Sequence, residues 1–232
     1  MGSFQARAVI FDLDGVLVDS EPLYADALNR VMVKEGVKPL TENESRDLIG
    51  TTVEDTWNAI KEMRSLTKPF EYYVGIYSPT LIEIFRAGLE LQPGAMDVVR
   101  MVRDRGLPLG LATSSRRAWV DVKLDVVGVN SMFDGIVTGD EVQKGKPSPE
   151  IYLSVAHLLG VPPAECLAIE DSPSGVASAM AAGMYTVAVR TESTAGLDIS
   201  HANVVIESLE QFDTGLLDGS KLSPTTRSAE AR

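Results

Sequence analysis

The sequence predicts an α/β protein with a doubly wound parallel sheet and an inserted helical domain. Strand-like and helix-like segments alternate from residue 92 onward, and one further apolar strand stands alone at 8–11. Alternation of this kind forms a parallel sheet with helices on both faces. The segment between these two parts shows helical patterns and no convincing strand. The expected units are a Rossmann-like core at 1–17 and 90–213, a helical-bundle domain at 20–88 and a loose C-terminal tail at 214–232.

The first strand is the continuous apolar run Ala8-Val9-Ile10-Phe11, which ends at Asp12-Leu13-Asp14-Gly15. A short apolar run closed by a turn residue is typical of a strand buried on both faces. In the insert that follows, capping residues, prolines and glycines delimit the helices. These signals predict helices at about 20–36, 41–49, 52–64 and 69–87, with a break at Pro79.

The remaining elements come in pairs of a helix and a strand. Helices are predicted at 94–105, 116–127, 148–159 and 175–182, and the strands that follow them at 107–113, 135–138, 166–170 and 185–189. A last short strand is predicted at 204–206. The tail contains few apolar side chains, so it is expected to stay loose.

The composition excludes several classes of protein. Among 232 residues, 33 are acidic and 21 are basic, which gives a net charge of −12. A basic nucleic-acid face and a polybasic membrane anchor are therefore not expected, and the most apolar stretch is too short to span a bilayer. The single cysteine, Cys166, forms no intrachain disulfide and indicates a reducing compartment such as the cytoplasm. We expect a monomer whose partner is a small metabolite.

Acidic side chains follow two of the predicted strands. Asp12 and Asp14 stand at the end of the first strand, and Glu170 and Asp171 at the end of the strand at 166–170. Ligands of open α/β sheets bind at the carboxyl ends of the strands, so these acids should converge on one crevice. One such acid could be a solvated loop residue, but four at two strand ends repel one another unless a cation lies between them. Hard oxygen ligands favour Mg²⁺.

Hydroxyl and cationic side chains are expected at the same crevice. Thr113 and Ser114 follow a strand and can hold an anion with their hydroxyls and backbone N–H groups, although a plain helix cap would use them too. Arg116 comes directly after them and could meet a second anionic group of a substrate. Lys146 lies in a loop stiffened by two prolines and can neutralise a phosphate. Together with an attacking carboxylate, this set indicates phosphoryl transfer.

Four segments of the chain resemble the motifs of the haloacid dehalogenase superfamily, in the family's order. The first is Phe11-Asp12-Leu13-Asp14-Gly15-Val16-Leu17-Val18-Asp19-Ser20-Glu21. The other three are Thr113-Ser114-Ser115, Lys146-Pro147 and Glu170-Asp171-Ser172-Pro173-Ser174-Gly175. The helical insert stands where the family's subclass I cap stands, and the resemblance extends over about 6–212. It points to the branch that contains β-phosphoglucomutase and related sugar-phosphate phosphatases.

The resemblance implies a role for each of these residues. Asp12 would be the nucleophile that forms an aspartyl phosphate. Asp14 would be the general acid and base, with its backbone carbonyl on the metal. The transferring phosphoryl group would be bound by Thr113, Ser114 and Lys146. The residues around Mg²⁺ would be Asp12, Asp14, Glu170 and Asp171.

The resemblance favours a phosphatase over a phosphomutase. Asp14 sets the chain apart from the family's phosphonatases and dehalogenases, which lack an acid at this position. In the β-phosphoglucomutase pattern a histidine stands twelve residues after the nucleophile, where this chain has Tyr24. The cap loop around Gly50 has Ile49 and Val53 where that pattern has lysine and arginine. We therefore expect a Mg²⁺-dependent phosphatase that acts on a small phosphomonoester such as a sugar phosphate, with a phosphomutase as the alternative.

A phosphorylation-dependent receiver domain is a more distant alternative, because it also uses clustered aspartates, a hydroxyl residue and a lysine. The length of the chain, the insert and the pair Asp12 and Asp14 on one strand disfavour it.

Arg116 and Gly50 are expected near the leaving group of the substrate, although either could be an ordinary surface or turn residue.

Overall fold

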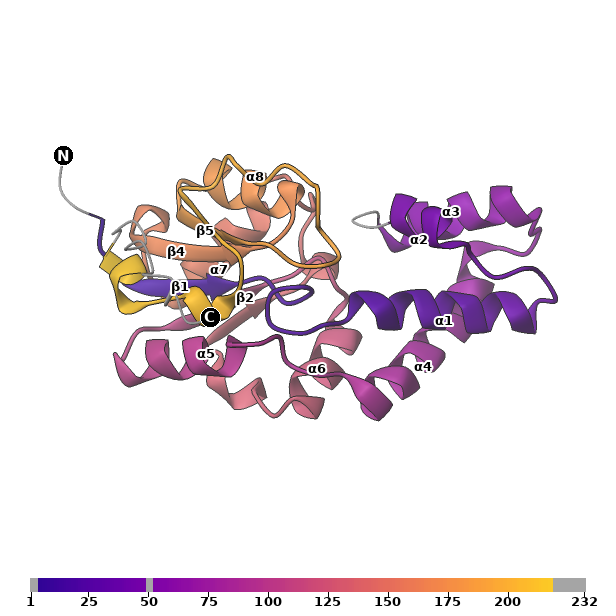
Figure 1. Cartoon of the computed structure of the whole chain (residues 1–232), viewed down its shortest axis with the longest axis horizontal. Coiled ribbons are helices and arrows are strands. Elements are labelled where there is room, and N and C mark those ends of the chain that lie inside the picture. The colour runs from indigo at the N-terminus through magenta and orange to yellow at the C-terminus, as the bar shows by residue number, and fades with distance from the viewer. Residues whose placement is uncertain (1–3, 49–51, 219–232) are drawn as a thin grey trace, which may run out of the picture.

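The computed structural model describes residues 4–48 and 52–218, which form a sheet flanked by helices and a helical cap to one side of it (Figure 1). The sheet has six parallel strands in the order β3-β2-β1-β4-β5-β6. The strands are β1 (Ala8–Phe11), β2 (Leu109–Ala112), β3 (Gly135–Val137), β4 (Cys166–Glu170), β5 (Tyr185–Val189) and β6 (Val204–Ile206). The predicted doubly wound parallel sheet is confirmed.

The strand order places β1 at the centre of the sheet. It pairs with β2 on one side, where Val9 lies opposite Leu109, and with β4 on the other, where Ile10 lies opposite Ala168. The order in which strands are added reverses between β1 and β4, and ligands bind outside the carboxyl ends of the strands at such a point. The residues that follow β1 and β4 therefore lie where proteins of this fold bind their ligands.

Helices cover both faces of the sheet. They are α5 (Ala95–Asp104), α6 (Arg117–Val126), α7 (Glu150–Leu159) and α8 (Pro173–Ala181). Because successive strand residues point to opposite faces, Val9 and Phe11 pack in the apolar cluster that includes α5 and α6, whereas Ala8 and Ile10 pack in a second cluster with α7. Burial on both faces explains why β1 is a continuous apolar run. None of the helices in the described ranges combines the length and the apolar character needed to cross a bilayer.

The helical cap is continuous in sequence. It consists of α1 (Glu21–Lys34), α2 (Glu42–Asp47), α3 (Val53–Arg64) and α4 (Phe70–Gly88). α1 and α4 pack against each other, and α3 contacts α4, where Trp57 stacks on Tyr73 with ring centroids 5.1 Å apart. The two chain crossings between core and cap lie side by side, because the Asp19 N–H donates to the Glu90 carbonyl at 3.1 Å.

The expected break at Pro79 is wrong, because α4 runs through this residue without interruption. Proline removes one backbone hydrogen bond and crowds the carbonyl four residues earlier, here that of Gly75. Both residues are exposed, so water can satisfy that carbonyl. Tyr77 and Leu81 continue the buried face on either side of the proline, and this packing keeps the helix intact.

The C-terminal segment is packed further than expected. Thr214–Asp218 forms a 3-10 turn in which Leu216 and Leu217 are buried, so the predicted loose tail does not begin at 214. The Ala6 N–H also donates to the Leu217 carbonyl at 2.6 Å. Burial of two adjacent leucines holds this short turn against the core. The low apolar content of the tail as a whole does not reveal these two residues. The part of that prediction that concerns 219–232 lies outside the described residues.

Candidate active site

Three acidic side chains meet at the carboxyl ends of β1 and β4. Asp12 follows β1, Glu170 is the last residue of β4, and Asp171 comes next. One carboxylate oxygen from each lies within 4.8 Å of the others, and all three residues are buried. The pairing of β1 with β4 produces this acid cluster, because both strands end at the same edge of the sheet. Three of the four acids that the sequence predicts to converge therefore do so, and the side chain of the fourth, Asp14, is not part of this group.

Lys146 reaches into the acid cluster from the loop after β3. Its Nζ atom lies 2.5 Å from Asp12 Oδ1 and 2.5 Å from Glu170 Oε1, and it donates to the Ala112 carbonyl at 3.0 Å. The Tyr152 hydroxyl donates to the same Glu170 oxygen at 2.7 Å. The ammonium group is therefore anchored between the first and fourth motifs, beside the proposed nucleophile.

The acid cluster carries more negative charge than Lys146 can neutralise. Burial raises the pKa of Asp12 to about 8; the Lys146 charge opposes this shift, and the charges of Glu170 and Asp14 add to it. Burial and the charges of Asp12 and Glu170 likewise hold the pKa of Asp171 well above its usual range. A bound divalent cation would remove this penalty. The oxygen donors suit a hard cation, so the acid cluster fits the metal site of this kind of fold.

Two glycines make room for the acid cluster. A Cβ atom on Gly15 would lie 2.1 Å from Asp171 Oδ2, and Gly15 also has a φ of +84°. A Cβ atom on Gly175 would lie 2.0 Å from the carboxylate of Glu170. Any larger residue at either position would displace a carboxylate, since such contacts are far below van der Waals separation. Gly15 of the first motif thus leaves space for Asp171 of the fourth motif. Gly175 leaves space for Glu170, which belongs to the same motif as Gly175.

Asp14 points into a different environment, made of hydrogen-bond donors. Its Oδ1 accepts short bonds from the Ser20 hydroxyl and the Lys123 ammonium group. Its Oδ2 accepts from the Ser115 hydroxyl at 2.7 Å and from the Thr113 hydroxyl at 3.4 Å. Burial by itself raises the pKa of Asp14, but the charge and hydrogen bond of Lys123 and the two serine hydroxyls outweigh it and hold the pKa below its usual value.

The structure brings together some of the predicted phosphate-binding residues. Thr113 is buried beside Asp14, and its hydroxyl accepts from the Ser115 N–H at 3.0 Å. Ser114 and Arg116 are exposed at the start of α6, so neither side chain lies inside the acid cluster. The predicted role of Gly50 falls outside the described residues.

Ser115 and Lys123 are site residues that the sequence reasoning missed as partners of Asp14. Ser115 stands in the second motif, where nothing in the sequence marks it as a partner of Asp14. Lys123 carried a usable signal, because it stands on the apolar face of α6 with Trp119 and Val120. A lysine within such a face calls for a buried partner of opposite charge.

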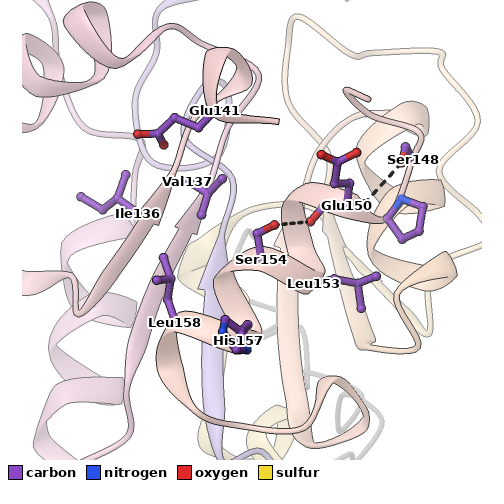
Figure 2. A pocket seen from close by; sticks show the side chains of 10 residues that line it. Ile136, Val137, Glu141, Ser148, Glu150, Leu153, Ser154, His157 and Leu158 are labelled. Carbon is purple, nitrogen blue, oxygen red and sulfur yellow. Dashed lines mark hydrogen bonds between the residues drawn. The ribbon is translucent and has the colours of Figure 1, made fainter. Parts of the chain in front are cut away.

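A hollow of about 700 Å³ lies elsewhere, between β3 and α7. Figure 2 shows Ile136 and Val137 on the strand and Leu153 and Leu158 on the helix, together with polar side chains such as Glu150 and His157. Neither Asp12 nor any other member of the acid cluster lines it. The hollow is therefore separate from the site that the strand ends build.

Known proteins resemble this chain in sequence and in architecture. Residues 9–189 match the family model for haloacid dehalogenase-like hydrolases. The phosphorylated carbohydrates phosphatase of Thermotoga maritima is 36% identical over 181 residues, which is 78% of this chain and 83% of the relative. Hexitol phosphatase B of Escherichia coli is 32% identical over 188 residues, which is 80% of this chain and 84% of the relative.

Solved structures agree with this relationship. A CbbY mutant from Rhodobacter sphaeroides in complex with xylulose 1,5-bisphosphate superposes with a TM-score of 0.84 at 26% identity, over 92% of this chain and 99% of the other. Sequence, fold and the four motifs at the strand ends thus converge on one family. The chain belongs to the haloacid dehalogenase-like hydrolases, in the branch of β-phosphoglucomutase-like proteins and sugar-phosphate phosphatases, and is a phosphatase of that family.

Proposed function

We propose that this protein hydrolyses small phosphorylated carbohydrates through an aspartyl phosphate on Asp12. The contrast between Asp12 and Asp14 carries this proposal: one carboxylate lies in the acid cluster beside Lys146, and the other lies among donors nearer the cap. The names of the curated relatives support a phosphorylated carbohydrate as substrate.

The reaction has two steps. An Asp12 oxygen attacks phosphorus, the ester bond breaks, and the leaving alkoxide takes a proton from Asp14. Water then attacks phosphorus, Asp14 takes the proton from that water, and the bond to Asp12 breaks to release inorganic phosphate. Asp14 starts and ends each cycle protonated, so the proton count balances. Between the two steps it is ionised, and this is the form that Lys123 and the serine hydroxyls favour.

A Mg²⁺ ion would be held by the carboxylates of Asp12 and Asp171, the Asp14 backbone carbonyl and Glu170, directly or through water. When bound, it would supply positive charge to the phosphate and to the acid cluster. Lys146 would supply the second positive charge from its place against Asp12. The Thr113 hydroxyl and the start of α6 at Ser114 would donate to the phosphoryl oxygens.

Hydrolysis is favoured over mutase chemistry by Arg64 and Val53 of the cap. A mutase must grip the non-reacting phosphate of a bisphosphate intermediate, which requires cations that face the core. Arg64 is committed elsewhere, because its guanidinium pairs with Glu44 at 2.7 Å and donates to the carbonyls of Lys38 and Pro39. Val53 supplies no charge, and Ile49 and Gly50 lie outside the described residues.

Arg116 is the proposed contact for a remote anionic or hydroxyl group of the substrate. It is exposed at the start of α6, next to the hydroxyl residues Thr113 and Ser114. A protein of net charge −12 needs local positive charge to admit an anionic metabolite. We further propose that the protein acts as a monomer in a reducing compartment.

The test compares hydrolysis with isomerisation. A panel of phosphomonoesters, including hexitol and pentulose phosphates, is assayed with and without Mg²⁺. The enzyme is then given β-glucose 1-phosphate with catalytic glucose 1,6-bisphosphate, and glucose 6-phosphate and free phosphate are followed together. Free phosphate should accumulate from at least one sugar phosphate. Rapid formation of glucose 6-phosphate with little phosphate release would overturn the proposal in favour of a mutase.

A further inference from the structure

Lys123 is a fully buried lysine that the four motifs do not contain. Its side chain has 0% exposure, and it shares the buried face of α6 with Trp119 and Val120. Its Nζ atom lies over the ring of Tyr24, 4.8 Å from the centroid, and over the ring of Phe85, 4.9 Å from the centroid. An aliphatic residue would fill this position at a lower cost of desolvation. Stability alone therefore does not account for a lysine here.

The hydrogen bonds of Lys123 all go to Asp14 or to a hydroxyl beside Asp14. The ammonium group contacts Asp14 Oδ1 directly. It also donates to the Tyr24 hydroxyl oxygen at 2.6 Å and to Ser115 Oγ at 3.1 Å. Both of these hydroxyls are themselves within hydrogen-bond distance of Asp14, the Tyr24 hydroxyl at 3.3 Å and the Ser115 hydroxyl at 2.7 Å. The lysine thus fixes the carboxylate directly and also fixes two of its other donors.

These contacts join the core to the cap. Lys123 belongs to α6 of the core, whereas Tyr24 belongs to α1 of the cap. Tyr24 packs edge-on against Trp119 of α6, with centroids 6.2 Å apart, and against Phe85 of α4 at 5.7 Å. The orientation of Asp14 therefore depends on both parts of the molecule.

We infer that Lys123 is a positioning residue: together with Tyr24, it holds the Asp14 carboxylate in the orientation from which it activates water against the phosphoenzyme. This assignment rests on the proposed function, in which Asp14 takes a proton from the attacking water. The hydrogen bonds of Lys123 go to Asp14, Tyr24 and Ser115 and not to the acid cluster, so it acts through Asp14.

The test uses p-nitrophenyl phosphate, because p-nitrophenolate leaves without needing a proton. With this substrate kcat/KM reports formation of the aspartyl phosphate, and kcat reports its hydrolysis by water when a burst shows that hydrolysis is the slower step. Lys123→Met keeps an unbranched side chain and removes the charge. We expect kcat to fall about 10- to 100-fold while kcat/KM changes less than about threefold. A burst of p-nitrophenol close to one equivalent per active site should precede the slow steady state.

Two further variants separate positioning from packing. Tyr24→Phe removes one hydroxyl and should give the same split at about two- to tenfold, which keeps the inference testable if Lys123→Met does not fold. Val120→Ala, on the same buried face of α6, should lower Tm while both kinetic constants stay within about twofold of wild type. Equal losses of kcat and kcat/KM without a burst in the lysine variant, or the same split in Val120→Ala, would overturn the assignment.

A double-mutant cycle tests whether Lys123 acts through Asp14. In an Asp14→Asn background, Lys123→Met should reduce kcat by no more than about a further twofold. A further loss as large as in the wild-type background would overturn the assignment, because Lys123 would then act without Asp14. Failure of the wild type to form any aspartyl phosphate would instead overturn the proposed function on which the assignment rests.

Discussion

Asp12 and Asp14 are separated by one residue at the end of β1, but their surroundings are opposite. Asp12 lies with Glu170 and Asp171, and burial among these acids raises its pKa to about 8. Asp14 is surrounded by donors, among them the Lys123 amine, and its pKa is held below the usual value although burial opposes this. Burial in turn lowers the pKa of Lys123, and the Asp14 charge opposes that shift.

The difference shows that the two carboxylates depend on different partners. A carboxylate attacks phosphorus only when it is ionised, so Asp12 requires positive charge beyond that of Lys146. Asp14 already has a cation and hydroxyls supplied by the chain. Environments that push neighbouring pKa values apart are typical of carboxylates with separate catalytic roles. Substitutions and metal removal can therefore disrupt one environment at a time.

The largest effect is expected from Asp12→Asn. The amide cannot form the covalent intermediate, so turnover of p-nitrophenyl phosphate should fall by about 10⁴-fold or more. Steady-state kinetics measure the loss, and circular dichroism checks that the variant is folded. Turnover at the wild-type level would contradict a covalent mechanism at this residue.

Removal of divalent cations should act on the Asp12 environment and abolish hydrolysis. EDTA should reduce activity to near background, and added Mg²⁺ should restore it. Mg²⁺ should also raise the Tm of the cation-free protein, because it binds the folded state and relieves repulsion among buried acids. Asp171→Asn is the matched control, since its Tm should respond less to Mg²⁺. Full activity in EDTA would show that the acid cluster needs no metal.

Asp14→Asn should have a smaller effect, because it removes proton transfer and leaves the nucleophile in place. We expect a loss of about 10²- to 10⁴-fold in kcat. The loss in kcat/KM should be larger for a sugar phosphate than for p-nitrophenyl phosphate, whose leaving group needs no proton. Equal losses with both substrates would argue against an acid role for Asp14.

The smallest effect concerns Glu21, which lies on the Asp14 side at the start of α1. Burial, with the Asp14 charge, raises the pKa of Glu21 from 4.5 to about 7, while Lys123 opposes the shift. A carboxyl whose folded pKa is raised costs stability as pH rises above its unfolded value and through the folded one. The Tm of Glu21→Gln relative to wild type should therefore increase between pH 5 and pH 8. A pH-independent difference would mean that Glu21 ionises freely in the folded protein.

The sequence predicts the acid cluster well, because strand ends in a parallel sheet converge whatever the loops do. Asp12, Glu170 and Asp171 each follow or end a continuous apolar run, and Lys146 is marked by its prolines. The same reasoning predicts that ligands bind at the carboxyl end of β1. It does so although the sequence does not predict the order of the strands in the sheet.

The Asp14 environment is harder to predict, because it is assembled across two domains. Ser115 and Lys123 come from the core and Tyr24 from the cap, and no local pattern says how the cap sits on the core. Pro79 illustrates the same limit, since packing of α1 against α4 overrides the local tendency of proline to end a helix.

The central claim is a covalent phosphate on Asp12, and mass spectrometry of enzyme quenched with acid during turnover tests it most directly. With Mg²⁺ and p-nitrophenyl phosphate, the peptide that contains Asp12 should carry a phosphoryl group, and the amount should rise in Asp14→Asn, where hydrolysis of the intermediate is slowed. The phosphate should be absent from the Asp12→Asn variant. Turnover without any phosphorylated peptide, or phosphate on a peptide that lacks Asp12, would contradict the account.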